Sequence, residues 1–247
     1  MLNQFSRTEL LFGSEAMQKL HDAHVAIFGI GGVGGYTVEA LARSGIGTFD
    51  LIDDDDVAIT NLNRQIIATT ETIGKPKVQV MAERIYSINP DAVVNIHQCF
   101  FLPENQEQFD FTQYDYVVDA VDTVAAKIAI IMAAKEVHTP VISSMGAGNK
   151  VNPSMFEVAD IYKTSVDPLA RVMRQAMKKR CVKKLKVVYS KEEPLKPLAN
   201  TAAAQEDPGI RRSLPASNAF TPSVAGLIIA SEVIKDLIDW NPKERKA

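Results

Sequence analysis

The fold is indicated by one stretch of the chain, Val25-Ala26-Ile27-Phe28-Gly29-Ile30-Gly31-Gly32-Val33-Gly34. Its first four residues are apolar, as in a buried strand, and they lead directly into glycines with the spacing Gly-x-Gly-x-x-Gly. Such a turn lets backbone N–H groups approach phosphates, and the N-terminus of the following helix adds partial positive charge. We therefore expect a strand, then a phosphate-binding turn built on Gly29, Gly31, Gly32 and Gly34, then a helix.

An acidic residue stands where sheets of this kind hold a ribose. The next apolar segment, Thr48 to Ile52, is followed by Asp53, 19 residues after Gly34. A carboxylate at the tip of the second strand can accept hydrogen bonds from ribose hydroxyls. The acids that follow, Asp54, Asp55 and Asp56, cannot all contact one ribose. We expect at least one of them to be a solvated loop charge or a cap for the next turn, and Asp55 to help bind adenylate-side groups.

Later motifs favour ATP over a dinucleotide. Asn61-Leu62-Asn63-Arg64-Gln65, then Lys77, then Asp119-Ala120-Val121-Asp122 add two cations and two carboxylates. ATP carries more phosphate charge than NAD, so a site that cleaves it needs an Arg and a Lys on the phosphates and a carboxylate to hold magnesium. The P-loop sequence Gly-x-x-x-x-Gly-Lys-Ser/Thr is absent from the chain, so the glycine turn would hold the phosphates.

Apolar segments alternate with helical patterns along the first two thirds of the chain. Helical candidates near 32–44, 76–88 and 124–138 separate five strand candidates, His24–Ile30, Phe49–Asp53, Val93–Cys99, Tyr116–Asp119 and Val141–Ser144. This order predicts an α/β fold with a doubly wound, mostly parallel Rossmann-like sheet, whose ligands collect at the carboxyl ends of the strands. Apolar spacing over 223–239 predicts a C-terminal helix packed on the body.

Length and composition indicate one globular domain. The 247 residues are 46% apolar with a formal net charge of −3, so the chain can bury a large core. We expect residues 1–165 to form a nucleotide-binding core, with 166–247 packed on it as a basic segment, a loop and the C-terminal helix. The run from Val224 to Ser231 is too short to span a bilayer, and the N-terminus has no signal-peptide pattern. With two cysteines and no disulfide framework, we expect a cytoplasmic protein without a membrane partner.

A basic segment follows residue 170. Eight cations fall within 16 residues without an acid, and subtracting them from the 27 Lys and Arg leaves 19 against 30 acids, a charge of −11 for the remainder. A concentrated patch on an acidic body suits a polyanion such as RNA, although a solvated helix face is the other interpretation. The candidate RNA contacts are Arg171, Arg174, Lys178, Lys179, Lys183 and Lys184.

The stretch 191–215 is rich in proline, which is typical of a loop or a crossover with short strands. A lid over the nucleotide and an ordinary surface excursion fit this stretch equally well. Cys181 lies among basic residues that would lower its pKa if they were close in space, which would suit a nucleophile. An incidental cysteine is the interpretation we favour. The spacing of the four histidines suggests no metal pair.

Together these motifs resemble the ThiF/MoeB/HesA family of adenylating enzymes, relatives of the ubiquitin-activating E1 proteins. The matching pieces are Phe5–Gly13, Gly29–Gly34, Asp53–Val57, Asn61–Gln65, Gly74–Lys77 and Asp119–Asp122. The resemblance implies an E1-like fold and activation of a carboxylate as an acyl adenylate with ATP. It also implies roles for the site residues: Asp53 on the ribose, Asn63, Arg64 and Lys77 on the phosphates with Gln65 beside them, and Asp122 near Mg²⁺. It further implies a homodimer in which Arg7 reaches the ATP of the partner subunit.

Within the family, the resemblance is closest to the enzymes that adenylate the carboxylate of N6-threonylcarbamoyladenosine in tRNA and cyclise it with loss of water. Ala82–Pro90, Gly146–Gly148 and Asp167–Leu169 also match this branch, whereas Gln4 replaces a common arginine and Val187–Ser217 matches little. Cys99 and Cys181 are the only cysteines, so the four-thiolate zinc site of many sulfur-carrier-activating relatives cannot be built. We therefore expect tRNA as the substrate partner, and no structural zinc.

Two alternatives remain open. The chain could adenylate the C-terminal glycine of a ubiquitin-like or sulfur-carrier protein, or it could be a dehydrogenase-like NAD-binding module. A sulfur-donor or desulfurase system as a further partner also remains open. In the favoured reaction Arg64, Lys77, Asp122 and the partner's arginine at position 7 act by positioning and electrostatics. No protein nucleophile is required.

Overall fold

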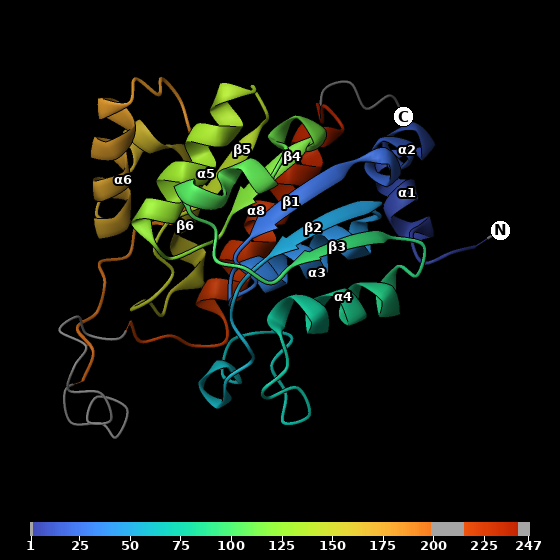
Figure 1. Cartoon of the computed structure of the whole chain (residues 1–247), viewed down its shortest axis with the longest axis horizontal. Helices are drawn as coiled ribbons and strands as arrows, with labels where there is room; N and C mark the ends of the chain where they lie inside the picture. The colour runs from blue at the N-terminus through green and yellow to red at the C-terminus, as the bar shows by residue number, and fades with distance from the viewer. Residues whose placement is uncertain (1, 199–214, 242–247) are drawn as a thin grey trace.

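One seven-stranded sheet organises the molecule, in the order β3-β2-β1-β4-β5-β7-β6 (Figure 1). The computed structural model describes residues 2–198 and 215–241. All neighbouring strands are parallel except β6 and β7, which are antiparallel. The strands are β1 (His24–Phe28), β2 (Thr48–Ile52), β3 (Val93–His97), β4 (Tyr116–Asp119), β5 (Val141–Ser144), β6 (Phe156–Asp160) and β7 (Lys186–Ser190). The predicted mostly parallel, Rossmann-like α/β sheet is confirmed.

Helices cover both faces of this sheet (Figure 1). One face packs against α3 (Gly34–Ser44), α4 (Lys77–Ile88) and α8 (Thr221–Leu237), and the other against α5 (Val124–Glu136) and α6 (Pro168–Lys179). Each face has its own apolar cluster, because side chains alternate across every strand. The short helices α1 (Ser6–Phe12) and α2 (Ser14–Asp22) precede β1 and lie toward the edge where that strand begins.

The register places the carboxyl ends of β1, β2 and β4 at the same edge of the sheet. Phe28 at the end of β1 pairs with Ile52 of β2 on one side and with Asp119 of β4 on the other. The three strands therefore finish at the same level. The strand order also reverses at β1, since the chain proceeds to β2 and β3 on one side and returns to β4 on the other. Ligands of open α/β sheets bind at such a reversal, outside the carboxyl ends of the strands.

Close packing fixes α8 against the start of α3. A Cβ on Gly226 would lie 2.3 Å from the carbonyl oxygen of Val33, so only glycine fits there. The hydroxyl of Thr37 donates to both the Val33 and the Gly226 carbonyl oxygens at 3.1 Å. Since Val33 belongs to the glycine turn, this packing holds the N-terminal half of α8 next to the predicted phosphate site.

Most predicted elements are present, with small differences at their ends. The strand expected to reach Ile30 ends at Phe28, because Gly29 turns the chain with a φ of 91°. The helix expected to reach residue 138 ends at Glu136, and His138 adopts a left-handed φ of 64°. The C-terminal helix expected over 223–239 spans Thr221–Leu237.

The structure adds elements beyond residue 150 that the sequence did not predict. β6, β7 and α6 are ordered parts of the fold, and β7 lies in the sheet between β5 and β6. Residues on both sides of position 165 thus share one sheet, and the expected division of a single domain at that position stays a prediction. Within the predicted loop 191–215, residues 199–214 lie outside the described residues, and 191–198 contain neither helix nor strand. The lid interpretation is therefore untested.

No helix among residues 2–198 and 215–241 is both long and apolar enough to span a membrane.

Candidate nucleotide site

The glycine turn is built by close approach of backbone atoms. A Cβ on Gly29 would lie 2.8 Å from the carbonyl oxygen of Ala120, and one on Gly34 would lie 1.8 Å from that of Gly29. Both positions therefore require glycine. At Gly31, by contrast, a Cβ would have only Gln65 Nε2 near it, at 4.0 Å. The turn is tight toward the sheet and open on the side where a phosphate would approach.

Asp53 is tied into the turn at the tip of β2. Its Oδ2 accepts the backbone N–H of Ile30 at 2.6 Å, and its Oδ1 accepts that of Asp55 at 3.0 Å. Burial raises the pKa of Asp53, while the nearby charge of Lys77 and the two backbone donors oppose the shift. Asp53 thus links the second strand to the glycine turn, and its predicted contact with a ribose stays a prediction.

Lys77 is a buried cation at the same edge. It is the first residue of α4, and its side chain is only 6% exposed. Its Nζ lies 2.5 Å from Asp55 Oδ2 and 3.5 Å from Asp53 Oδ1. The side chain of Asp55 is 65% exposed, so that carboxylate can turn into solvent and give way to a phosphate oxygen at little cost. The carboxylates of Asp53, Asp54 and Asp55 lie close enough to share a cation, and the ammonium of Lys77 already contacts two of them.

Arg64 is a cation without an acidic partner. Within the described part of the chain it forms no ion pair, and its NH1 donates to the Thr60 carbonyl oxygen and to Asn63 Oδ1, both at 2.9 Å. Its Cγ would lie 3.5 Å from a Cβ on Gly32, which places the arginine beside the glycine turn. Its remaining N–H groups can therefore bind an oxyanion at the turn.

Gln65 carries an unpaired polar atom. Its side chain is buried, and among the residues that the structure describes its Oε1 is the only buried side-chain oxygen or nitrogen without a hydrogen-bond partner. An unpaired buried acceptor costs about 1 to 3 kcal/mol. The other amide atom, Nε2, would lie 4.0 Å from a Cβ on Gly31, so the Gln65 amide lies beside the glycine turn, and its predicted contact with the nucleotide stays a prediction.

The motif Asp119-Ala120-Val121-Asp122 contains two carboxylates with different environments. Asp119 is fully buried, and both of its oxygens accept from Lys127 Nζ at 3.1 Å while Oδ2 also accepts from the Ser143 hydroxyl at 2.5 Å. Both oxygens of Asp119 thus have partners within the chain, and this carboxylate is not free for a ligand. Asp122 is exposed on the loop before α5, where its Oδ1 accepts from the Thr123 hydroxyl at 3.3 Å. Asp122 is therefore the carboxylate of the motif that remains available to a ligand, and its predicted place near magnesium stays a prediction.

Arg7 lies away from the site of its own chain. It is exposed on α1, and the neighbouring Phe5 ring lies 3.7 Å from a Cβ on Gly45, at the C-terminal end of α3. The glycine turn lies at the other end of α3, and an 11-residue helix is about 16 Å long. A role of Arg7 in an ATP site therefore requires the site of another subunit.

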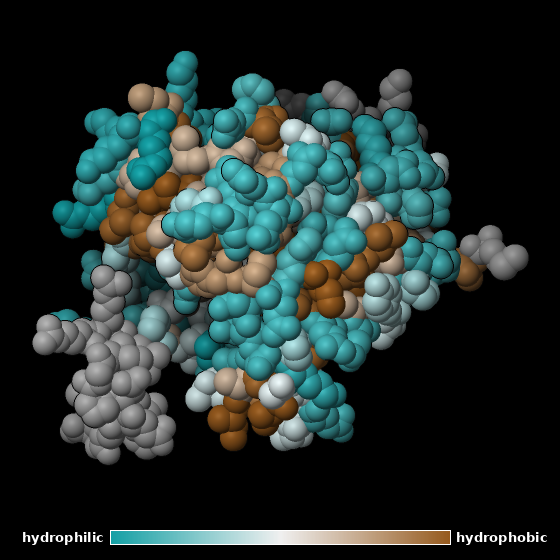
Figure 2. Space-filling view, in the orientation of Figure 1, coloured by the Kyte–Doolittle hydropathy of each residue, from teal (hydrophilic) through white to brown (hydrophobic). Residues whose placement is uncertain are grey.

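The basic segment forms α6 and the turn before β7. Lys178, Lys179, Lys183 and Lys184 are exposed, and Figure 2 shows a hydrophilic surface over α6 at the upper left. Three of the eight cations are engaged within the protein: Arg174 donates to the Thr164 carbonyl oxygen at 2.7 Å, Arg180 donates to the Ala176 carbonyl oxygen at 3.1 Å, and Lys186 forms ion pairs with two acids of α8.

The exposed lysines of this segment lie at the opposite edge of the sheet from the glycine turn. Lys183 and Lys184 lie three and two residues before the start of β7, which is parallel to β5, so they lie at the edge where the parallel strands begin. Lys184 is also near Lys135 at the end of α5, where burial and the charge of Lys184 lower the pKa of Lys135. A five-residue strand spans about 17 Å. A ligand that touches both the lysines and the turn would have to be large.

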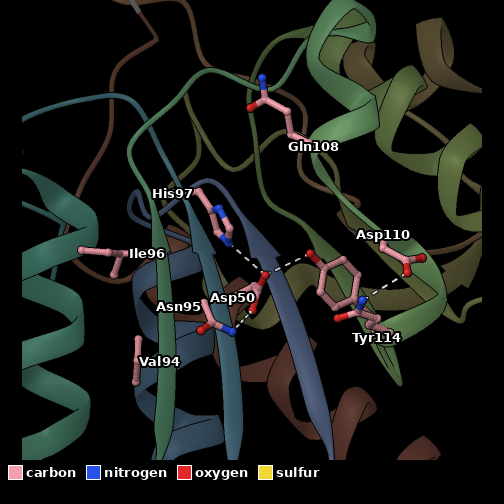
Figure 3. Close-up of a pocket in the computed structure, with 9 residues that line it drawn as sticks. Asp50, Val94, Asn95, Ile96, His97, Gln108, Asp110 and Tyr114 are labelled. Atoms are coloured by element: carbon pink, nitrogen blue, oxygen red, sulfur yellow. Dashed lines mark hydrogen bonds and ion pairs between the residues drawn. The ribbon is translucent and has the colours of Figure 1, made fainter.

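A second polar cluster surrounds Asp50, whose side chain points to the face of the sheet that packs against α5 and α6. Figure 3 shows His97, Asn95 and Tyr114 directed at its carboxylate, which lines a cavity of about 570 Å³. His24 completes the set at 2.8 Å. Burial opposes ionisation of Asp50, but these donors prevail and hold its pKa well below the usual range. Each carboxylate oxygen has two donors from the chain itself, so we interpret the cluster as structural.

Comparisons with known proteins give a consistent result. The ThiF family model matches residues 5–247. A tRNA threonylcarbamoyladenosine dehydratase of Bacillus subtilis (strain 168) is 45% identical over 243 residues, which cover 96% of this chain and 96% of the relative. The sulfur carrier protein ThiS adenylyltransferase of Escherichia coli (strain K12) is 37% identical over 147 residues, 59% of this chain and 58% of that protein.

A solved structure of the same kind of enzyme has the same fold. The E. coli tRNA N6-threonylcarbamoyladenosine dehydratase in complex with ATP superposes with a TM-score of 0.85 at 34% identity, covering 98% of this chain and 96% of that one. The seven-stranded sheet with its helices on both faces is thus the architecture of an ATP-binding relative.

Proposed function

Because the chain belongs to the ThiF family, we propose that it uses ATP to adenylate the carboxylate of N6-threonylcarbamoyladenosine in tRNA and then cyclises it with loss of water. The geometric observation that carries this proposal is the pair of cations at the glycine turn: Arg64 lies beside Gly32, and Lys77 contacts Asp53, whose carboxylate is bonded to the backbone of the turn. A dinucleotide would not need this charge, whereas a departing pyrophosphate does. The dehydratase relatives support the choice of substrate, because one of them matches nearly the whole chain.

The first step joins the substrate carboxylate to AMP. A carboxylate oxygen attacks the α-phosphorus, the bond to the bridging oxygen of the β-phosphate breaks, and pyrophosphate leaves with that electron pair. Arg64 and Lys77 would bind the phosphate oxygens on which negative charge accumulates. Asp122 would hold Mg²⁺, whose charge would offset that of the phosphates. Asp53 would orient the ribose from the tip of β2.

The second step closes a ring. A nitrogen of the same modified nucleoside attacks the activated carbonyl carbon, the bond to AMP breaks, and the nitrogen loses its proton to solvent or to AMP. The net change in the nucleoside is the loss of one water, and ATP becomes AMP and pyrophosphate. No thiol takes part, which agrees with the burial-raised pKa of Cys99 and leaves the exposed Cys181 without an assigned role.

Two partners complete the proposal. Arg7 would act in the ATP site of a second copy of this chain, because it lies about one helix length from its own glycine turn. The exposed lysines of α6 and the following turn would bind the body of the tRNA, while the modified nucleoside enters the site at the opposite edge. We expect these reactions to take place in the cytoplasm, where both free cysteines would stay reduced.

The second candidate, adenylation of a carrier protein, is supported by the shorter match to the ThiS adenylyltransferase. Pyrophosphate release from ATP separates the two. With tRNA that carries N6-threonylcarbamoyladenosine we expect release in proportion to the modified nucleoside, and only background with unmodified tRNA or with a carrier protein ending in Gly-Gly. Release that depends on the carrier protein would favour the second candidate.

A further inference from the structure

Asn149 joins the two ends of the excursion between β7 and α8. It follows β5 in a left-handed conformation with a φ of 60°. Its backbone N–H donates to the carbonyl oxygen of Ala216 at 2.7 Å, and its Oδ1 accepts the backbone N–H of Ala216 at 2.7 Å. Its carbonyl oxygen accepts the backbone N–H of Leu195 at 2.7 Å. One residue thus holds both the outgoing and the returning segment.

The returning segment, residues 215–218, crosses to the phosphate-side residues. At its start, a Cβ on Gly148 would lie 2.9 Å from Pro215 Cβ. At its end, the carbonyl oxygen of Ser217 accepts from Asn63 Nδ2 at 3.1 Å. Beyond it, Pro222 of α8 would lie 3.1 Å from a Cβ on Gly32 of the glycine turn. The segment therefore connects the loop after β5 with the glycine turn and with Asn63.

Asn63 connects this segment to Arg64 through two side-chain hydrogen bonds. Because the Nδ2 of Asn63 is held by Ser217, its Oδ1 is directed to the other side, where it accepts from Arg64 NH1 at 2.9 Å. If residues 215–218 moved, the Asn63 amide could rotate, and Arg64 NH1 would keep only the Thr60 carbonyl oxygen as acceptor. The orientation of the guanidinium beside the glycine turn depends on both acceptors.

Asparagine suits position 149 because of both its backbone conformation and its side-chain acceptor. Asparagine is among the few residues other than glycine that adopt the left-handed conformation readily. Its side chain adds the bond from Ala216 that glycine could not provide. Glycine would keep the backbone shape and both backbone bonds, so it isolates the contribution of the side chain.

We propose that Asn149 is a positioning residue of the ATP site: it fixes residues 215–218, which orient Asn63 and, through Asn63, the guanidinium of Arg64. No hydrogen bond joins Asn149 to Asn63 or Arg64 directly, so it acts only through this segment. The inference rests on the proposed role of Arg64 on the ATP phosphates.

The test compares Asn149→Gly with His138→Gly in the full chain. His138 is also left-handed, but it follows α5 on the far side of the sheet from the glycine turn, so its replacement controls for the general effect of a new glycine. We expect Asn149→Gly to raise the KM for ATP about 3- to 10-fold in pyrophosphate release, the value of one hydrogen bond. His138→Gly should leave the KM unchanged, and Asn149→Asp, which keeps an acceptor, should recover most of the loss.

A second comparison separates positioning from a structural role. In an Asn63→Ala background the connection to Arg64 is already broken, so adding Asn149→Gly should not raise the KM further. The same fold-increase in both backgrounds, or a wild-type KM for Asn149→Gly, would overturn the inference. If instead Asn63→Ala and Arg64→Ala both kept wild-type kinetics, the proposed placement of the phosphates would fail. Melting temperatures measured alongside show whether each variant is folded.

Discussion

At the scale of single residues, the two phosphate-side cations are prepared differently. Lys77 is buried, and its ammonium group is held in a fixed position by contacts with Asp53 and Asp55. A phosphate oxygen could replace the exposed carboxylate of Asp55 as its partner. Arg64 forms no ion pair with any of the residues that the structure describes, and two neutral oxygens orient it. A guanidinium group without a carboxylate partner can bind an oxyanion without first breaking an ion pair. The two cations would therefore contribute electrostatic stabilisation without first breaking a strong buried ion pair.

Replacing either cation should remove activity and not the fold. We expect Arg64→Ala and Lys77→Ala each to cost about 2 to 4 kcal/mol in the barrier, because each removes a charge-assisted hydrogen bond to the departing pyrophosphate. Turnover and thermal melting should be measured together. Lys75→Ala, an exposed lysine two residues before Lys77, is the matched control and should retain activity. A normal rate in a folded Arg64 or Lys77 variant would mean that the phosphates bind elsewhere.

Asp50 provides a pH-dependent prediction of stability. Its folded-state pKa lies below the unfolded value of about 3.9, so the stability it contributes is present above that value and is lost as pH falls toward the folded pKa. Asp50→Asn should lower the free energy of unfolding at pH 7 by about 1 to 3 kcal/mol, since four donors lose their charged acceptor. The difference from wild type, measured by denaturant titration, should shrink below about pH 4. A constant difference from pH 7 to pH 3 would contradict the assignment.

At the scale of elements, α6 and the turn before β7 form the surface least explained by the sheet. Only Ala170, Met173 and Met177 of α6 are buried, and the exposed side carries the lysines. Those lysines lie at the edge opposite the glycine turn, at least a strand length of about 17 Å away. If they bind RNA, they hold a part of it remote from the reacting nucleoside.

Neutralising this surface should weaken RNA binding specifically. A variant with Lys178, Lys179, Lys183 and Lys184 changed to Ala should bind tRNA more weakly and with a flatter salt dependence, by about 0.7 to 0.9 in the log–log slope for each phosphate that the variant no longer neutralises. ATP binding should be unchanged. A control with Lys19, Lys75, Lys191 and Lys235 changed to Ala removes the same charge elsewhere. Equal slopes for wild type and the α6 variant would show that these lysines are a solvated face.

The sequence predicted the elements around the glycine turn because their signals are local. Gly29 and Gly34 are required by contacts within the strand–turn–helix unit, and Asp53 follows the next strand at a fixed interval. The different environments of Asp119 and Asp122 could not be inferred from their positions. A signal was nevertheless present, since Lys127 is the only charged residue in the first two thirds of an apolar helix, where a buried lysine needs an acid.

The missed elements beyond residue 150 differ in the signals that their sequences carry. α6 could have been recognised, because Asp167-Pro168 is a typical helix start and the buried residues at 170, 173 and 177 follow a helical period. The insertion of β7 between β5 and β6 had no local signal. The connection from Asn149 to Asn63 is likewise made through backbone atoms of residues 216 and 217, which no side-chain pattern reveals.

At the scale of the whole molecule, the positions of Arg7 and the glycine turn at opposite ends of α3 predict a shared active site. In a two-fold dimer each chain would supply Arg7 to the other. Mixing inactive Arg7→Ala with inactive Asp122→Ala chains should then restore part of the activity, because one of the two sites in the hybrid dimer regains both groups. Absence of recovery, with subunit exchange demonstrated by differently tagged chains, would tell against a shared site.

The central claim, ATP-driven dehydration of N6-threonylcarbamoyladenosine in tRNA, is tested most directly by mass spectrometry of nucleosides. Modified tRNA is incubated with the protein and ATP, digested to nucleosides and compared with samples that lack ATP or contain Arg64→Ala. The account predicts that the threonylcarbamoyladenosine peak is replaced by one lighter by a single water, only with the wild-type chain and ATP together. An unchanged nucleoside, under conditions in which the protein is folded and binds ATP, would contradict it.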